Sequence, residues 1–294
     1  MGYHSIVLVK QVPDLKSVTG ECLKPDGTLN RSLLPAIFNP EDLNALEMAL
    51  MIKDKYGGTV RVLTMGPPSA IEILRESLYM GADECVLLTD KNFAGSDTQA
   101  TSLILKTAVE KVGIYDFIFC GRQAIDGDTA QVGPQIAEKL GIPQITYVEQ
   151  LLELKEHIIT LKRRIRDDFE IVRSEIPILV TVLSTANTPR PQQARRILKF
   201  KKAQILSETI EANNDKEISK KKLERLKQKG LLIAKWGRED LFLNKDKCGI
   251  SGSPTRVIKT KKVVLRRKER KKFEPTQEAI NSLFHELYRE YTFG

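Results

Sequence analysis

A chain of 294 residues with 41% hydrophobic content can bury one large domain, or one domain with an added arm. No apolar run approaches the ~18 residues of a membrane span, and residues 1–10 lack a signal peptide's apolar region and cleavage site. We therefore expect a soluble, cytoplasmic protein without membrane insertion.

Cysteine and histidine are too sparse for the usual metal or catalytic sites. The chain has four cysteines and three histidines. The cysteines are far apart and form no C-x-x-C pair, which argues against iron–sulfur or zinc binding. We interpret them as reduced, buried thiols: Cys22, Cys85, Cys120 and Cys248.

The net charge of +9 is concentrated late in the chain. Basic residues form two runs: residues 220–222 with Arg225, Lys227 and Lys229, and residues 266–268 with Arg270, Lys271 and Lys272. Such runs are typical of solvated surface, and they also suit the docking of an acidic redox partner. No aromatic residues are interleaved with the lysines, so nucleic-acid binding is not expected.

The first part of the chain alternates apolar strands with helices. Strands are predicted at 5–9, 59–65, 84–88 and 116–120. One helix begins at Asn39-Pro40, where proline and two acids suit a first turn, and closes at Gly57. Further helices are predicted at 68–80 and 97–112, and a last one ends at Gly141. This alternation predicts a parallel sheet with helices on both faces.

Three motifs stand at the carboxyl ends of these strands. They are Lys10, Met65-Gly66 and Gly121. Ligands of open α/β sheets bind beyond the carboxyl ends of the strands. We therefore expect the three motifs to converge on one crevice.

The loop after the strand at 116–120 carries the strongest signal for a ligand. It begins at Gly121 and opens a helix, for which Asp128 or Thr129 is the predicted N-cap. The amides of residues 129–132 would then be free at the positive end of the helix dipole, which favours a phosphate. We expect Gly121 and Gly127 to allow close approach of a ligand. An ordinary strand–turn–helix corner would have the same spacing.

The pattern changes from about Tyr147. Residues 159–172 read as an antiparallel hairpin, followed by a buried strand at 176–183 and a loop at 184–193. Past about residue 208 the chain is a polar, lysine-rich arm that ends in a helix capped by Thr276. An apolar stripe on this helix would cover either the domain's own core or a second subunit: Ile280, Leu283, Phe284 and Leu287.

The sequence contains no G-x-G-x-x-G, P-loop or pyrophosphatase signature. Paired acid and base residues are also missing. A phosphate crevice without a nucleophile or general base suits a flavin carrier, in which the cofactor performs the redox chemistry.

Several collinear motifs resemble electron-transfer flavoprotein beta subunits. In the loop, Gln123-Ala-Ile-Asp126 is followed by Asp128-x-x-Gln131. The other motifs are Ile6-Val-Leu-Val-Lys10 with Gln11-Val-Pro13, Asn39-Pro40, Met65-Gly66-Pro67, Met80-Gly-Ala-Asp83, Pro177-Ile-Leu-Val-Thr181 and Asn187-Thr-Pro-Arg190. The resemblance covers residues 3–205, and Gly252-Ser-Pro-Thr255 extends it into the tail.

The resemblance implies an α/β fold with a three-layer Rossmann-like parallel sheet of the adenine-nucleotide hydrolase type. An antiparallel hairpin and an extended C-terminal arm would be added to it. Residues 1–207 would form the nucleotide- or flavin-binding domain. Residues 208–294 would form the basic arm, with its terminal helix packed on the partner subunit.

Ordinary members of this family bind AMP in the crevice, whereas electron-bifurcating members bind FAD there. The Asp126-Gly127-Asp128 segment and the Gly-Ser-Pro-Thr tail resemble the bifurcating type. Gly127 also removes a carboxylate from beside the expected pyrophosphate, which favours a diphosphate. We therefore expect FAD, with AMP as the alternative and a stand-alone adenine-nucleotide sensor as the alternative of another class.

The resemblance implies specific roles in cofactor binding. Residues 129–132 would bind the pyrophosphate through backbone N–H groups, Asp126 and Gln131 would orient hydroxyls, and Arg122 would steady the reduced flavin. Leu8, Asn39, Met65 and Gly66 would hold the adenosine half. The full predicted set is Leu8, Lys10, Asn39, Met65, Gly66, Gly121, Arg122, Gln123, Ala124, Asp126, Gly127, Asp128, Thr129, Ala130, Gln131 and Val132.

The implied partners are an alpha subunit carrying its own FAD, an acyl-CoA-type or related dehydrogenase, and ferredoxin or flavodoxin. NADH would be the electron donor, and this chain alone is not expected to catalyse a reaction. The family uses the loop at 184–193 to dock dehydrogenases. Here Ala186 stands where a leucine anchor is often found, so the loop does not identify the dehydrogenase.

Overall fold

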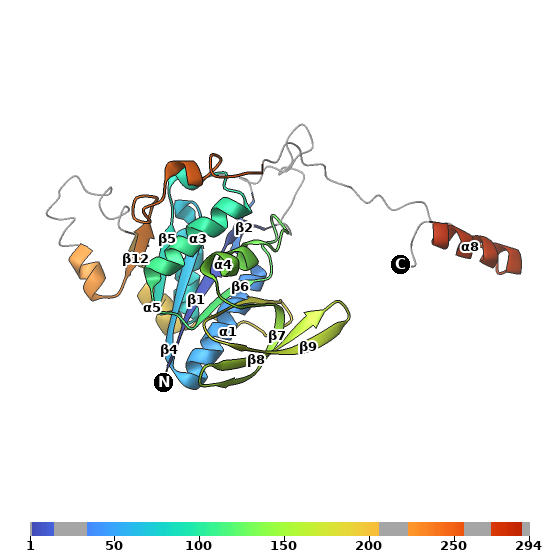
Figure 1. The fold of residues 1–294 in the computed structure, drawn as a ribbon, viewed down its shortest axis with the longest axis horizontal. Helices are drawn as coiled ribbons and strands as arrows, with labels where there is room; N and C mark the ends of the chain where they lie inside the picture. Colours follow the sequence, from blue (N-terminus) through green and yellow to red (C-terminus); the bar gives the residue numbers. More distant parts are fainter. Residues whose placement is uncertain (1, 15–33, 206–222, 256–271, 290–294) are drawn as a thin grey trace. The chain divides into compact units, whose positions relative to one another are not determined.

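The computed structural model describes residues 2–14, 34–205, 223–255 and 272–289 (Figure 1). The chain divides into two compact units, residues 1–256 and 257–294, which are described separately. Cys22 and the basic residues 220–222 and 266–271 lie outside the described residues. Cys85, Cys120 and Cys248 are buried free thiols.

A large, mostly parallel sheet forms the centre of the first unit. Its strands are β1 (Tyr3–Val9), β4 (Gly58–Met65), β5 (Glu84–Leu88), β6 (Phe117–Gly121), β7 (Gln144–Lys155), β8 (Ile158–Ile165), β9 (Asp168–Glu175), β10 (Ile178–Val182), β11 (Gln204–Ile205) and β12 (Leu232–Trp236). Their order in the sheet is β11-β12-β5-β4-β1-β6-β10-β7-β8-β9. A separate antiparallel pair joins β2 (Gln11–Pro13) and β3 (Ala36–Phe38).

Helices pack against both faces of this sheet, which confirms the predicted α/β fold. They are α1 (Pro40–Tyr56), α2 (Ile71–Met80), α3 (Thr98–Val112), α4 (Val132–Leu140) and α5 (Ala194–Phe200), with short 3₁₀ helices η4 (Pro68–Ala70), η5 (Lys91–Phe93) and η6 (Lys245–Lys247). The buried side chains of α3 and α4 belong to one apolar cluster, and those of α1, α2 and α5 to another. Within the described ranges, no helix is both long and apolar enough to cross a membrane.

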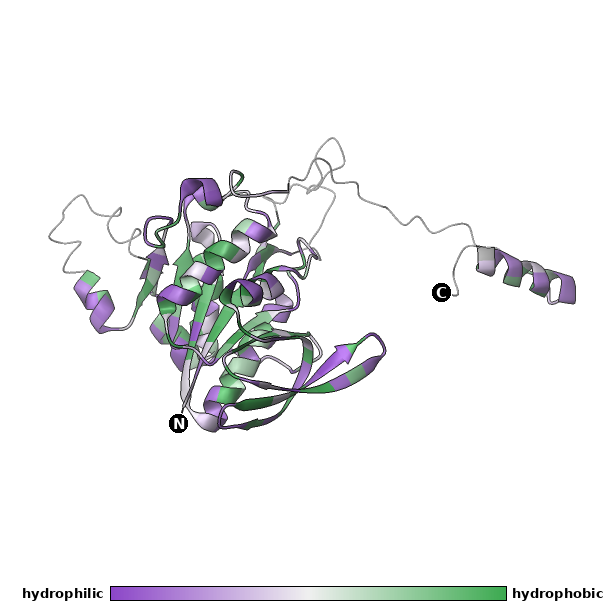
Figure 2. Ribbon diagram, viewed as in Figure 1, coloured by the Kyte–Doolittle hydropathy of each residue, from purple (hydrophilic) through white to green (hydrophobic). Residues whose placement is uncertain are grey.

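Alternating side chains of the central strands enter the two clusters. Val7 and Val9 of β1 face the cluster of α1 and α2, whereas Ile6 and Leu8 face that of α3 and α4. A strand buried on both faces is continuously apolar, which explains the strong hydrophobic runs in the sequence. Figure 2 shows this as hydrophobic central strands under more polar helix surfaces.

The hairpin of β8 and β9 is antiparallel, as predicted, and lies at one edge of the sheet (Figure 1). Strand β7 was not predicted from the sequence. This strand pairs parallel to β10 through residues such as Ile145, and then pairs antiparallel to β8 from Val148 onward. It therefore joins the parallel sheet to the hairpin.

The structure differs from the predicted domain boundary at residue 207. Strand β12, which was placed in the arm, pairs in parallel with β5 and β11. Ile233, Leu241 and Cys248 are buried. These few apolar residues are buried by contacts with distant parts of the chain. The polar composition of the surrounding segment gives no sign of this burial.

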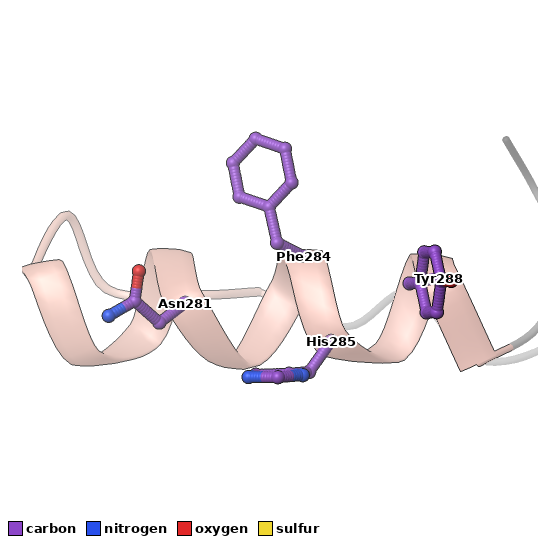
Figure 3. Close-up of a pocket in the computed structure, with 4 residues that line it drawn as sticks. All are labelled: Asn281, Phe284, His285 and Tyr288. Carbon is purple, nitrogen blue, oxygen red and sulfur yellow. The ribbon is translucent and has the colours of Figure 1, made fainter.

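The second unit contains helix α8 (Gln277–Arg289). The Thr276 hydroxyl accepts a hydrogen bond from the Ala279 amide at 3.3 Å, which confirms the predicted cap. Ile280 and Phe284 of the predicted stripe are 41% and 59% exposed. Figure 3 shows Phe284 and His285 projecting from different sides of this helix.

Candidate functional site

The carboxyl ends of β1, β4 and β6 bring three predicted motifs to one edge of the sheet. Strand β1 lies between β4 and β6, and all three are parallel. Lys10, Met65-Gly66 and Gly121 therefore stand at neighbouring strand ends. Chain connections run to opposite sides of β1 at this point, which is where open α/β sheets form a ligand crevice. Leu8 is 5% exposed, and its side chain packs in the core.

Side chains at the start of helix α1 hold the loop that follows β6. The Asn39 side chain, which is fully buried, donates from Nδ2 to the Gln123 carbonyl at 2.9 Å and accepts from the Ile125 amide at 3.2 Å. Glu41 accepts from the Gln123 amide at 3.0 Å and forms an ion pair with Arg122 at 3.1 Å. The structure thus gives Asn39 a role in shaping the loop, and its contact with an adenosine remains a prediction.

The side chain of Asp42 links the carboxyl ends of β1 and β6. Its carboxylate accepts from the Lys10 amide after β1 and from the Gly121 amide at the end of β6, both at 2.8 Å. Burial raises the pKa of Asp42 to about 7, although these two amide donors act to lower it. Glu41 and Asp42 were predicted only as acids of a helix start. No local pattern in the sequence distinguished them from ordinary first-turn acids.

Gly121 is required by this close approach of α1. A Cβ atom at Gly121 would lie 2.5 Å from the Asp42 carboxylate and 2.8 Å from the Glu41 backbone. Packing against the helix is therefore one reason for glycine here, and access for a ligand stays a prediction. At Gly127, by contrast, a Cβ atom would meet nothing within 4 Å, so this position is open.

The acidic residues of the loop accept hydrogen bonds from neighbouring side chains, and in one case the partner is a cation. Lys10 binds both carboxylate oxygens of Asp126, at 2.7 and 2.8 Å. Gln123 donates from its side chain to Asp128 at 2.9 Å. Each carboxylate is thus held by a neighbouring donor group, which limits its repulsion of an anion bound nearby.

Helix α4 begins later than the sequence predicted. Its first residue is Val132 and its N-cap is Gln131, whereas Asp128 or Thr129 was expected. Asp128 and Ala130 have left-handed backbone with φ of 49° and 52°, which cannot continue a right-handed helix. The predicted C-cap is confirmed, because Gly141 closes the helix in a left-handed conformation.

In this geometry, several backbone amides between the loop and helix α4 have no hydrogen-bond acceptor among the described residues. Gly127 and Asp128 donate to the Ala124 carbonyl in a turn. Among the described residues, none accepts a hydrogen bond from the backbone amides of residues 129–133. These amides lie at and just before the N-terminus of α4, where the helix dipole favours an anion. Left-handed residues in such a run are typical of concave anion-binding backbone.

Arg122 lies beside the loop but already has partners. Its guanidinium forms the ion pair with Glu41 and lies 5.8 Å from the ring centre of Tyr147. Its backbone amide donates to Val182 at the end of β10. The position is at the rim of the crevice, while its predicted contact with a flavin is untested by this geometry.

The site contains polar and charged groups suited to binding. In the part of the chain that the structure describes, no group of three His, Cys, Asp or Glu residues could hold a metal ion. What the arrangement offers is a row of amide donors at the carboxyl-terminal edge of the sheet, with Lys10, Asp126 and Gln131 nearby.

Comparisons with known proteins agree with this geometry. The family described as "Electron transfer flavoprotein domain" matches residues 26–215. The chain is 44% identical over 255 residues to "Electron transfer flavoprotein subunit beta" of Thermoanaerobacterium thermosaccharolyticum, with 87% of this chain and 86% of that protein covered. It is 41% identical over 257 residues to "Acryloyl-CoA reductase electron transfer subunit gamma" of Anaerotignum propionicum, covering 86% of each.

A third relative is "Caffeyl-CoA reductase-Etf complex subunit CarD" of Acetobacterium woodii. The identity is again 41% over 257 residues, which covers 87% of this chain and 86% of that protein. These matches show that the chain belongs to the electron transfer flavoprotein family, among its beta subunits.

Proposed function

We propose that this chain is the beta subunit of an electron-bifurcating electron transfer flavoprotein and that it binds FAD in the crevice. The observation that carries the proposal is the row of free amides at 129–133, which fits phosphate oxygens. Those amides begin two residues after an open position at Gly127. A diphosphate needs such space more than the single phosphate of AMP does.

The residues around the amides have distinct proposed roles. The amides of residues 129–132 bind the pyrophosphate, and Asp126 and Gln131 orient ribityl or ribose hydroxyls. Met65 and Gly66 line the adenosine half from the end of β4. Lys10 keeps the Asp126 carboxylate in place through its two short contacts.

When bound, the flavin would supply the redox chemistry, taking hydride from NADH and releasing the two electrons singly. We propose that one electron goes to ferredoxin or flavodoxin and the other through the alpha-subunit FAD to an acyl-CoA-type dehydrogenase. The names of two relatives, which refer to an acryloyl-CoA reductase and a caffeyl-CoA reductase, support a partner of this kind.

The test is a flavin count on the complex purified with its alpha subunit. Two FAD per heterodimer, together with NADH-dependent reduction of ferredoxin, is the expected result. One FAD and one AMP per heterodimer would instead identify a non-bifurcating carrier. A colourless beta chain that does not assemble with alpha would identify a stand-alone nucleotide sensor.

A further inference from the structure

The segment 249–255 is attached to the start of helix α3 through Asp97. One carboxylate oxygen of Asp97 accepts from the Ala100 amide at 3.0 Å and thereby caps the helix. The other accepts from the amide and the hydroxyl of Thr255, at 3.0 and 2.7 Å. The Asp97 amide donates to the Ser253 hydroxyl at 2.8 Å. Partial burial acts to raise the pKa of Asp97, but these hydrogen bonds outweigh it and the pKa lies below its ordinary value.

The next residue, Thr98, contacts the nucleotide loop. Its hydroxyl donates to the side-chain oxygen of Gln131 at 2.9 Å and accepts from the Gln135 side chain at 3.3 Å. A hydroxyl has one proton, so the Gln135 donor fixes the direction in which Thr98 donates. Gln131 is also the N-cap residue of α4, within the row of free amides.

This contact determines which group of Gln131 remains available. Its oxygen is engaged by Thr98, and its NH₂ group has no hydrogen-bond partner among the described residues. The free group therefore carries two donors and no acceptor. A ligand atom that meets this NH₂ group has to be an acceptor, such as a phosphate or hydroxyl oxygen.

We infer that Thr98 is a positioning residue of the nucleotide site, which orients Gln131 as a donor, and that Asp97 and Thr255 hold Thr98 in place. The inference rests on the proposed nucleotide binding. It assigns the Ser253–Thr255 end of the tail a function in the site, although these residues face Asp97 and not the loop.

The test measures ADP binding by calorimetry to the alpha–beta complex after removal of the bound beta-subunit nucleotide. Thr98→Val keeps the shape but removes the hydroxyl, and we expect it to weaken ADP binding roughly 3- to 10-fold. Thr98→Ser restores the hydroxyl and should bind as the wild type does. Thr107→Val is the matched control, because its hydroxyl lies on the same helix and donates only to the Leu103 carbonyl.

A second arm examines the tail. Thr255→Val should weaken ADP binding in the same direction, Thr255→Ser should restore it, and combining Thr98→Val with Thr255→Val should cost less than the sum of the two. Unchanged ADP affinity in Thr98→Val, or failure of Thr98→Ser to restore it, would overturn the inference. Failure of the wild-type complex to bind ADP would instead refute the proposed function.

Discussion

At the scale of residues, two buried carboxylates decide which amides of the loop remain free. Asp42 and Glu41 accept from the amides of Gly121 and Gln123 at the start of the loop. Asn39 engages the Ile125 amide. The amides of Gly121, Gln123 and Ile125 are thus taken by the protein, whereas the amides of residues 129–133 have no acceptor among the described residues.

The raised pKa of Asp42 predicts a pH dependence of stability. Burial raises this pKa from 3.8 to about 7, so ionisation is disfavoured in the folded state. The resulting stability is fully present below pH 3.8 and is lost as the pH rises to about 7. Asp42→Asn cannot ionise, so its free energy of unfolding should fall less over this range than that of the wild type. Urea unfolding at both ends of the range measures the difference, and equal falls would contradict the assignment.

The open position at Gly127 allows a test of charge without a steric clash. Gly127→Asp would place a carboxylate beside a bound diphosphate, with repulsion of about 4 kcal/mol at ~4 Å and an effective dielectric of ~20, before screening. The complex should lose the beta-subunit flavin and keep the alpha-subunit flavin. Gly127→Ala is the control, since nothing lies within 4 Å of its Cβ position. Two flavins per heterodimer in the Asp variant would refute the phosphate assignment.

The sequence indicated the loop but not its supports. Glycine and aspartate after an apolar strand are local signals, so Gly121–Asp128 could be predicted as a ligand loop. Glu41 and Asp42 could not be distinguished from ordinary first-turn acids, because their burial depends on the contact between α1 and a loop 80 residues later along the chain.

At the scale of elements, the start of α4 shows how side-chain competition moves a helix boundary. Aspartate is a preferred N-cap residue, but the carboxylate of Asp128 accepts a hydrogen bond from the Gln123 side chain instead. Left-handed backbone at Asp128 and Ala130 then delays the helix to Val132. Strand β12 was missed because it is only five residues long and its pairing with β5 is non-local.

Close packing of α4 on the sheet predicts a second glycine effect. A Cβ atom at Gly133 would lie 2.8 Å from the Cys120 sulfur and 3.0 Å from the Thr181 methyl. Gly133→Val should therefore destabilise the fold by about 1–3 kcal/mol through overpacking. Chemical denaturation of the isolated variants provides the measurement, with Gly127→Val as a control in open space. Equal stability of the two variants would show that α4 can shift without cost.

At the scale of the whole molecule, the sequence did not decide whether the basic runs are solvated surface or a docking surface for an acidic partner. The chain carries 47 Lys and Arg against 38 Asp and Glu, which gives the net charge of +9. The sequence also placed the arm's start at residue 208, whereas the first compact unit extends to residue 256. Composition alone could not reveal that part of the lysine-rich region contributes a strand to the sheet.

If the arm attracts an acidic electron carrier, ferredoxin reduction by the complex should slow steeply with added salt. Replacing both Lys271, which lies outside the described residues, and Lys272 by Gln should flatten that dependence. Lys201→Gln with Lys202→Gln is a charge-matched control on the first unit. A slope that is unchanged in the arm variant, or flattened equally in the control, would leave the arm as solvated surface.

The apolar stripe of α8 predicts an effect on assembly. Ile280 and Phe284 are 41% and 59% exposed, and burying each such side chain should contribute roughly 1.5–3 kcal/mol. The sheet of the first unit already has helices on both faces. We therefore propose that α8 packs on the alpha subunit, where its stripe would be covered.

Truncation after Phe273 should then leave the beta chain folded, with an unchanged melting temperature, while weakening its association with alpha. Phe284→Asp should weaken association in the same way, because it places a charge in a stripe that the alpha subunit would bury. Ser282→Asp adds the same charge outside the stripe and should have little effect. The affinity is measured by titrating one purified subunit with the other. A truncated chain that unfolds would show that the helix belongs to this chain's own core. A truncated chain that binds alpha at full strength would show that the helix contributes nothing to that interface. Either result would contradict packing of α8 on the partner subunit.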